Sequence, residues 1–326
     1  MRRAALIAAL LTPAAPVAAG DPVLGLPIDC ILGQTCYIQH YVDRDPEPGA
    51  QDYRCGGLSY DGHKGTDFAT DTLARMHSGV NVLASAAGQV VRMRDGVPDQ
   101  IYSSENAAAV DGRECGNGVV LLHDDGWETM YCHMKQGSVL VSKGDQVAAG
   151  AVLGQVGLSG KTQFPHLHLT VYHNGRVVDP FDLSNVETCN SDATSQTMSD
   201  VWQTVPGYHP GGMINAGFTP DIPDYGDVQA GTAAQATLPT DAPALVLFGF
   251  SYGGRKGDVI HLEITGPAGP LAAQQIILDK DQARFFRAAG KRLKQDLWPS
   301  GIYTGTVRMM RAGTELGQTT TRVVVK

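Results

Sequence analysis

Short apolar stretches separated by glycines fill the sequence from residue 80 to residue 182. Two of them, Gly118 to His123 and Trp127 to Tyr131, flank an Asp-Asp-Gly turn, which is typical of a β-hairpin. Further strands are expected at Val80 to Ser85, Gly88 to Met93 and Gln146 to Leu153. The chain has 39 Gly and 18 Pro and lacks long heptad-like apolar patterns. These features predict a turn-rich, mostly β fold.

The C-terminal part of the sequence shows a second series of strands without any cluster of catalytic residue types. Its regular strand spacing predicts a small β-sandwich over residues 242–326. Between the two series, residues 188–241 are rich in Ser, Thr, Ala, Gly and Pro, which predicts a linker. Isolated aromatics such as Trp202 and Tyr208 argue against a fully disordered tether.

The first 19 residues are typical of a secretory signal. Arg2 and Arg3 precede an apolar stretch, and Val17-Ala-Ala19 provides small residues for cleavage. The apolar stretch is too short to span a bilayer. We therefore expect an exported mature chain, periplasmic or secreted, without a membrane span.

Cysteine usage agrees with export. Six cysteines follow the signal, and an even number in an exported chain predicts disulfides, although six allow fifteen connectivities. The absence of a Cys-x2-Cys pair argues against a cysteine metal site. All six precede residue 190, so the disulfides would brace the first part of the mature chain.

The charge of the chain argues against nucleic acid as a partner. The net charge is −8 and no basic stripe is present, so nucleic-acid binding is not expected. The segment from Lys280 to Lys294 holds six Lys or Arg residues interleaved with Phe285, Phe286 and Leu293. We interpret it as a solvated face, with weak contact to an anionic wall polymer or a partner protein as the alternative.

Five chemistry-bearing side chains lie within about a hundred residues of one another, so one domain can hold them all. They offer imidazole nitrogens and a carboxylate, the donors of a catalytic zinc centre, and spare imidazoles to move protons. Residues two apart on a strand share a face, so His166 and His168 project the same way. The five are His63, Asp67, His133, His166 and His168.

Each of these residues could also have a purely structural role, without a metal. Gly62 and Gly65 favour a loop at His63-x3-Asp67, where the two side chains could simply hydrogen-bond to each other. His133 could be an ordinary strand-end histidine, and a His-x-His pair alone is a weak signal. The three features together favour a metal site.

The motifs also occur in a specific order. They are His63-x3-Asp67, Gly116-Asn-Gly-Val ahead of Tyr131-x-His-Met, Gly157-x-Ser-Gly, Pro165-His-Leu-His-Leu and Val177-Val-Asp-Pro-Phe181. This pattern resembles the lysostaphin/LytM-type zinc endopeptidases over residues 57–181. The resemblance implies an antiparallel β-sheet core with the metal in a groove, and cross-linked peptides of bacterial peptidoglycan as substrates.

The resemblance also implies roles for the five residues. One Zn2+ would be bound by His63, Asp67 and His168. His133 and His166 would flank the attacking water as general base and oxyanion stabiliser. The function implied is an exported zinc metalloendopeptidase that hydrolyses peptide cross-links of peptidoglycan through a metal-activated water.

The sequence departs from the family pattern at two places. Cys132 stands beside His133 where a small residue is usual, and we expect Cys115 and Cys132 to form a disulfide near the open end of the hairpin. The stretch from Arg94 to Glu114 lengthens a loop near the expected groove, where it could restrict access. Neither change removes a proposed ligand.

The expected organisation combines these elements into a LytM-type core followed by a small β-sandwich. The ranges are 1–19 signal peptide, 20–56 N-terminal extension with a Cys pair, 57–187 zinc peptidase domain, 188–241 linker and 242–326 binding or docking domain. Through the last of these, cell-envelope proteins are candidate partners.

Two other functions compete with the peptidoglycan endopeptidase. The chain could be a non-catalytic LytM-type regulator that binds cell wall or an amidase, or a metallopeptidase directed at exported proteins. The remaining histidines are expected to be ordinary, with His123 a surface or supporting group: His40, His77, His123, His173, His209 and His261. Asn117 could orient backbone or substrate near the groove, or merely form a turn.

Overall fold

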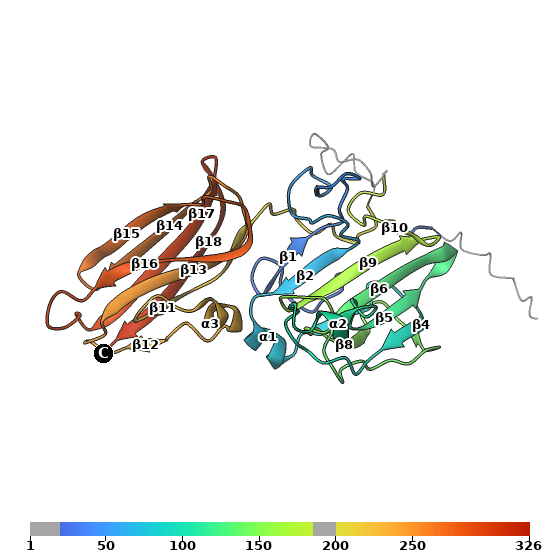
Figure 1. Ribbon diagram of the computed structural model, residues 1–326, viewed down its shortest axis with the longest axis horizontal. Helices are drawn as coiled ribbons and strands as arrows, with labels where there is room; N and C mark the ends of the chain where they lie inside the picture. The colour runs from blue at the N-terminus through green and yellow to red at the C-terminus, as the bar shows by residue number, and fades with distance from the viewer. Residues whose placement is uncertain (1–19, 185–199) are drawn as a thin grey trace, which may run out of the picture.

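The computed structural model describes residues 20–184 and 200–326. Figure 1 shows two β-rich bodies side by side along the long axis of the molecule. The predicted signal peptide and Cys189 lie outside the described residues. Within those residues, the helices are too short or too polar to cross a membrane.

The first body is built on an eight-stranded sheet in the order β1-β2-β9-β6-β5-β4-β7, with β10 paired to β9. A two-stranded sheet, β3-β8, accompanies it. Two short helices and a 3-10 turn connect the strands. The elements are β1 (Cys36–His40), β2 (Thr66–Thr70), α1 (Leu73–Ser78), β3 (Asn81–Leu83), β4 (Gly88–Arg94), α2 (Ala107–Val110), β5 (Asn117–Leu122), η1 (Asp124–Gly126), β6 (Trp127–Met134), β7 (Gln146–Val147), β8 (Val152–Gln155), β9 (His166–His173) and β10 (Arg176–Val178).

Turn chemistry explains where these strands end. Asp125 and Gly126 have φ values of 53° and 76°, so the Asp-Asp-Gly segment reverses the chain and β5 and β6 form the predicted hairpin. The single strand expected from Gln146 to Leu153 is instead two short strands. Gly150, with φ of 79°, turns the chain between them, which sends β7 and β8 to different sheets.

Alternation along β9 links the core to the candidate site. Leu167, Leu169 and Val171 are almost completely buried in the main hydrophobic cluster. Each such side chain contributes about 1.5–3 kcal/mol through burial. Because side chains alternate across a strand, the same register directs His166 and His168 to the opposite face.

The second body is the predicted β-sandwich. One sheet has the order β11-β13-β16 and the other β12-β18-β17-β14-β15. Leu247, Phe285 and Val307 are among the buried residues that fill the space between them. The elements are β11 (Gly212–Thr219), α3 (Tyr225–Ala230), β12 (Thr237–Leu238), β13 (Ala244–Gly254), β14 (Val259–Gly266), β15 (Gly269–Ile277), β16 (Gln282–Arg292), β17 (Gly301–Arg311) and β18 (Thr314–Val325). The expectation of a mostly β chain, with an antiparallel core followed by a sandwich, is confirmed.

The structure differs from the sequence-based boundaries in two places, and it assigns the basic segment to a strand. The predicted extension 20–56 contributes β1 to the main sheet, and its Cys30 forms a disulfide with Cys36. The predicted linker 188–241 contains β11, which pairs with β13 along its whole length. The basic segment is largely β16: its Lys280, Lys291, Arg292 and Lys294 are exposed, as a solvated face requires, whereas Phe285 is only 2% exposed and lies in the core. In each case pairing with a distant strand overrides local composition.

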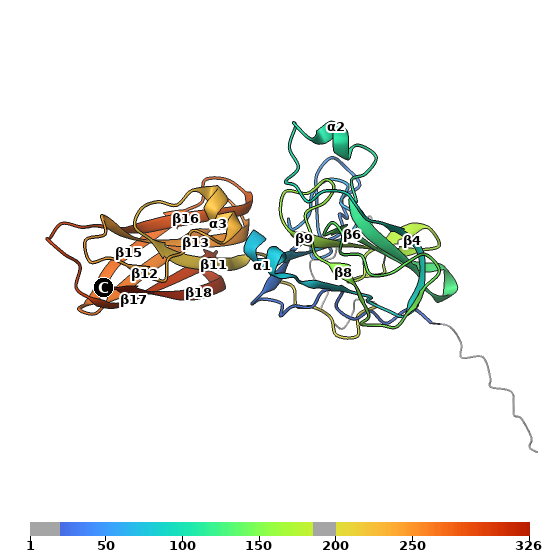
Figure 2. The ribbon, with the colours of Figure 1, turned by 90° about the horizontal axis from the view of Figure 1, so that it is seen from below.

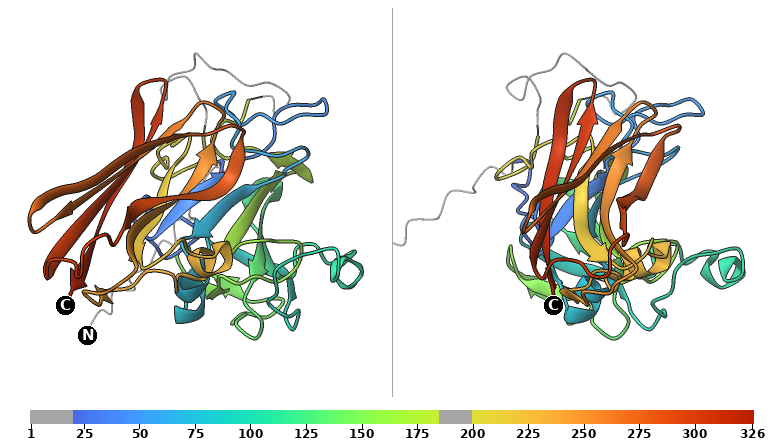
Figure 3. Two further views of the ribbon diagram at one scale, coloured as in Figure 1. Left: turned by 60° about the vertical axis from the view of Figure 1, so that its left-hand side comes forward. Right: turned by 90° about the vertical axis from the view of Figure 1, so that its left-hand side faces the viewer.

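The two bodies are in direct contact. Figure 2 shows them next to each other along the long axis, with α1 at the boundary, and Figure 3 views the molecule from two further directions in which the bodies overlap. The ring centroids of Tyr37 and Tyr252 lie 4.4 Å apart across this boundary. The Gln39 side-chain amide donates to the carbonyl of Ala283 at 3.1 Å. Tyr252, a residue of the sandwich, belongs to the hydrophobic cluster of the first body, so the sandwich contributes to the core of that body.

Candidate active site

Adjacent strands bring three predicted ligands together. Asp67 on β2 is paired with His168 on β9, so their side chains share a face. His63 lies in the loop that leads into β2. The Nε2 atom of His63 is 3.2 Å from Oδ1 of Asp67 and 3.1 Å from Nδ1 of His168, and the latter two are 2.8 Å apart.

The chemistry of these three atoms fits a metal ion. The ring of His63 donates from Nδ1 to the carbonyl oxygen of Tyr41 at 2.7 Å, which leaves a lone pair on Nε2 in the neutral ring. That lone pair meets the Asp67 carboxylate and His168 at contact distance, an arrangement that a positive charge between them stabilises. Burial lowers the pKa of the His63 ring, but the Asp67 carboxylate raises it above its usual value, so without a metal a proton on Nε2 takes this place. Zinc-ligand bonds of about 2.0–2.1 Å in a tetrahedral site imply ligand separations of about 3.3 Å. The observed separations are close to this value.

The remaining atoms of the three ligands are held by neighbouring groups. Nε2 of His168 is 2.9 Å from the hydroxyl of Thr170. Nδ1 of His40 donates to Oδ2 of Asp67 at 3.0 Å, which leaves Oδ1 free to face the metal position. Such contacts fix the orientation of metal ligands and raise metal affinity.

His40 therefore differs from the expectation that it is an ordinary histidine. It lies on β1, directly opposite Asp67 in the strand register. No local motif marks it, because its position beside Asp67 depends on the pairing of β1 with β2. Only a prediction of that register could have identified it from the sequence.

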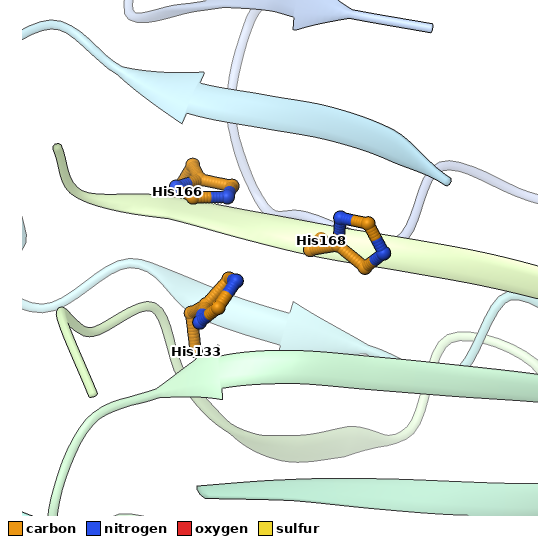
Figure 4. A group of neighbouring side chains, drawn as sticks. All are labelled: His133, His166 and His168. Carbon is orange, nitrogen blue, oxygen red and sulfur yellow. The ribbon is translucent and has the colours of Figure 1, made fainter. Parts of the chain in front are cut away.

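His133 and His166 lie beside His168, one of the three proposed ligands (Figure 4). Their ring centroids are 4.7 Å apart. His133 follows Cys132, which faces His168 in the sheet, so a regular strand would direct His133 to the opposite face. Its φ of 62° breaks the regular strand and turns the ring toward the site.

The tautomers of these two rings follow from their acceptors. The Nδ1 of His133 donates to the carbonyl of Ser159 at 2.8 Å. The Nδ1 of His166 lies 2.9 Å from the carbonyl of Phe164, and this contact assigns its proton to Nδ1 as well. Each neutral ring then carries its lone pair on Nε2. His166 Nε2 is 3.4 Å from Oδ1 of Asp67, so this lone pair is directed into the site.

Burial controls the charges in the cluster. Burial alone would raise the pKa of Asp67, but the adjacent His63 and His166 lower it well below its usual range. The carboxylate is therefore ionised. Burial, together with His166 and His168, lowers the pKa of His133 well below its usual value, so its ring is neutral.

A second set of three donors shares one member with the first. His133, His166 and His168 also have ring nitrogens within 4.8 Å of one another. This set lacks a carboxylate, and His133 and His166 do not approach His168 as closely as Asp67 and His63 do. The tighter set that includes Asp67 fits a zinc ion better.

The predicted disulfide between Cys115 and Cys132 is confirmed. Its sulfurs join the end of the long loop to β6, immediately before His133. The carbonyl of Cys115 also accepts a hydrogen bond from the backbone N–H of His133 at 2.8 Å. The cross-link therefore holds the backbone that presents His133.

Asn117 anchors the long loop before β5. Its side-chain amide donates to the carbonyls of Val97 and Met134, and its oxygen accepts from the N–H of Val97. Asp99 of the same loop accepts from the N–H of Leu158 at 2.7 Å. Figure 2 shows α2, within this loop, projecting away from the sheet.

The other histidines lie outside the cluster. The ring of His123 contacts the carbonyl of Ala87 and the hydroxyl of Thr129, and His173 stacks on Trp127. His77 is exposed on α1, and His261 is on β14 of the sandwich.

Residues 61–180 match the model of peptidase family M23. This stretch contains all five clustered residues. The first body is an M23-family, LytM-type domain.

Several curated proteins are similar to part of this chain. The DD-carboxypeptidase/endopeptidase Mpg of Neisseria meningitidis is 31% identical over 112 residues, which are 34% of this chain and 23% of that protein. The peptidoglycan DD-endopeptidase ShyA of Vibrio cholerae is 33% identical over 117 residues, 36% of this chain and 22% of that protein. The chain thus matches less than a quarter of the length of these relatives.

Solved structures with M23 domains are also similar. The catalytic domain of the antimicrobial peptidase lysostaphin from Staphylococcus simulans is 25% identical, with a TM-score of 0.28. The alignment covers 43% of this chain and 86% of that domain.

Proposed function

We propose that this protein is an exported zinc metalloendopeptidase that hydrolyses peptide cross-links of bacterial peptidoglycan, in the periplasm or outside the cell. The observation that carries the proposal is the contact between His63, Asp67 and His168 beside two further imidazoles. The names of the relatives, which include a peptidoglycan DD-endopeptidase, support the substrate class.

His63, Asp67 and His168 would hold one zinc ion through Nε2, Oδ1 and Nδ1. When bound, zinc acts as a Lewis acid that polarises a carbonyl and lowers the pKa of a water molecule to about 7. His40 keeps Oδ2 of Asp67 occupied, so the carboxylate offers one oxygen to the ion.

His133 and His166 would move protons. Nδ1 of each ring is bonded to a backbone carbonyl, so Nε2 is the atom that accepts a proton from the attacking water. A ring protonated at Nε2 can stabilise an oxyanion and then transfer the proton to the leaving amine. Both rings are buried, so they have little contact with bulk solvent.

Digestion of purified sacculi tests the proposal. We expect the zinc-loaded protein to release peptides whose masses correspond to cleaved cross-links, and defined muropeptides would identify the bond. Removal of zinc by a chelator, with metal analysis to verify it, should abolish release. Full activity of the verified metal-free protein would exclude the zinc mechanism. Cleavage of exported proteins but not of sacculi would show that the substrates are proteins and not peptidoglycan.

Two substitutions separate metal binding from proton transfer. His168→Ala should lose zinc and activity together because it removes a ligand. His133→Ala should retain zinc and lose turnover by about 10²–10⁴-fold, the usual effect of removing a general acid or base. Wild-type hydrolysis by His133→Ala would remove that residue from the scheme. Zinc binding by the wild type without any cleavage would favour the non-catalytic regulator.

A further inference from the structure

Arg284 of the sandwich reaches across the boundary between the two bodies. It lies on β16, and its guanidinium carbon is 5.1 Å from the ring centroid of Phe164 in the M23 domain. The same carbon is 4.8 Å from the ring centroid of Phe250 on β13. The guanidinium is therefore packed against one aromatic ring from each body.

Aromatic rings, rather than carboxylates, surround this cation. Within the described parts of the chain, no carboxylate lies within 4.0 Å of Arg284. Its Nε and Nη2 are buried and have no acceptor in hydrogen-bond geometry there. Burial raises the pKa of Tyr37 to about 12, and the charge of Arg284 opposes this rise, which indicates that Arg284 lies near Tyr37. A planar guanidinium is suited to such stacking.

Phe164 connects this cation to the candidate catalytic centre. Its ring stacks on His166, with centroids 4.3 Å apart and planes at 23°. Its carbonyl oxygen is the acceptor for Nδ1 of His166 at 2.9 Å. A shift of Phe164 would thus displace both the aromatic ring that stacks on His166 and the carbonyl oxygen that accepts the proton of its Nδ1.

We propose that Arg284 is a positioning residue for His166 and that it acts through Phe164. The sandwich is then a structural part of the active site, in addition to any docking role. This inference depends on the proposed function for its kinetic consequences. Small displacements of a reacting group lower the rate strongly, so the effect should appear in kcat.

Arg284→Met tests the proposal while keeping the apolar stem of the side chain. We expect kcat to fall roughly tenfold, with KM and zinc content unchanged, because the substitution alters none of the three proposed ligands and acts on the position of His166. Arg287→Met is the matched control on the same strand. Arg287 donates within the sandwich, to Gln282 and to the carbonyl of Phe286, so its replacement should leave kcat unchanged. An unchanged kcat in Arg284→Met would overturn the proposal.

A double-mutant cycle with Phe164→Leu tests the route. If Arg284 acts through Phe164, the double variant should have the same kcat as Phe164→Leu alone. If the fold-loss of kcat in the double variant equals the product of the fold-losses in the two single variants, Arg284 acts by another route. Arg284→Lys keeps the positive charge but lacks the planar guanidinium that stacks on the aromatic rings, so it should recover only part of the wild-type rate.

Histidine ring spectra supply a readout that needs no turnover. In the zinc-loaded protein, Arg284→Met should shift the ring ¹H and ¹⁵N resonances of His166, whereas Arg287→Met should not. Unchanged His166 resonances would contradict the proposal even if the enzyme is active. If the wild type cleaves no peptide, the proposed function fails while this arm still tests the position of His166.

Discussion

At the scale of single residues, His40 belongs to the site although it lies outside every motif. Its hydrogen bond to Oδ2 of Asp67 orients the carboxylate that would bind zinc. His40→Ala should therefore lower zinc affinity by about 10–100-fold, measured by competition with a chelator. His77→Ala, which changes an exposed histidine on α1, is the control. Equal affinities in the two variants would contradict this role.

Asp179 supplies a pH-dependent contribution to stability. Burial raises the pKa of its carboxyl to about 7, against the opposing effects of the Phe181 N–H and of Arg44, whose Nη1 is 3.8 Å away. Between about pH 4 and pH 7 the folded protein holds a proton that the unfolded chain has released. The free energy of unfolding therefore falls as pH rises through this window, by at most about 1.4 kcal/mol per pH unit.

Asp179→Asn removes this titration while keeping the shape of the side chain. Urea unfolding at a series of pH values should give a flatter dependence on pH than in the wild type. Asp296→Asn, at an exposed position of the sandwich, should leave the wild-type dependence unchanged. A parallel pH dependence in Asp179→Asn and the wild type would show that this carboxyl is already ionised at low pH.

At the scale of elements, the Cys115–Cys132 disulfide joins the long loop to β6 beside His133. It closes a loop with a sequence separation of 17, and a cross-link of that span contributes about 3 kcal/mol. Replacement of both cysteines by Ala should lower Tm and also kcat, with zinc retained, because the backbone before His133 is released. The Cys30–Cys36 bridge spans only six positions, so its double Ala variant should keep kcat. Equal kinetic losses in both would assign the effect to general destabilisation.

At the scale of the whole molecule, the two bodies share buried surface. Tyr252 of the sandwich is 5% exposed and belongs to the core of the M23 domain. Calorimetry should therefore record one unfolding transition for the full chain. Tyr252→Ala should cost about 3 kcal/mol, the lower part of the range for a large aromatic side chain, and should separate the transition into two. Ile277→Ala, at a position 68% exposed, should change neither. Two transitions in the wild type would show that the bodies unfold independently.

The sequence alone determines the features of this protein that depend on residues close together in the chain. Strand-length apolar stretches and the Asp-Asp-Gly turn depend on neighbours a few residues apart, so the mostly β fold and the hairpin could be predicted. The five clustered residues were candidates from their residue types, and the resemblance to a family implied which three of them are ligands. The pairing of Cys115 with Cys132 also followed from their expected closeness at one end of that hairpin.

Tertiary structure alone decided the features that depend on contacts between distant segments. The register of β1 against β2 places His40 on Asp67, and the pairing of β11 and β16 with β13 turns a predicted linker and a basic stretch into sandwich strands. The same packing brings Arg284 onto Phe164. These contacts join residues far apart in the chain, and their free energy comes from shared burial that no local pattern encodes.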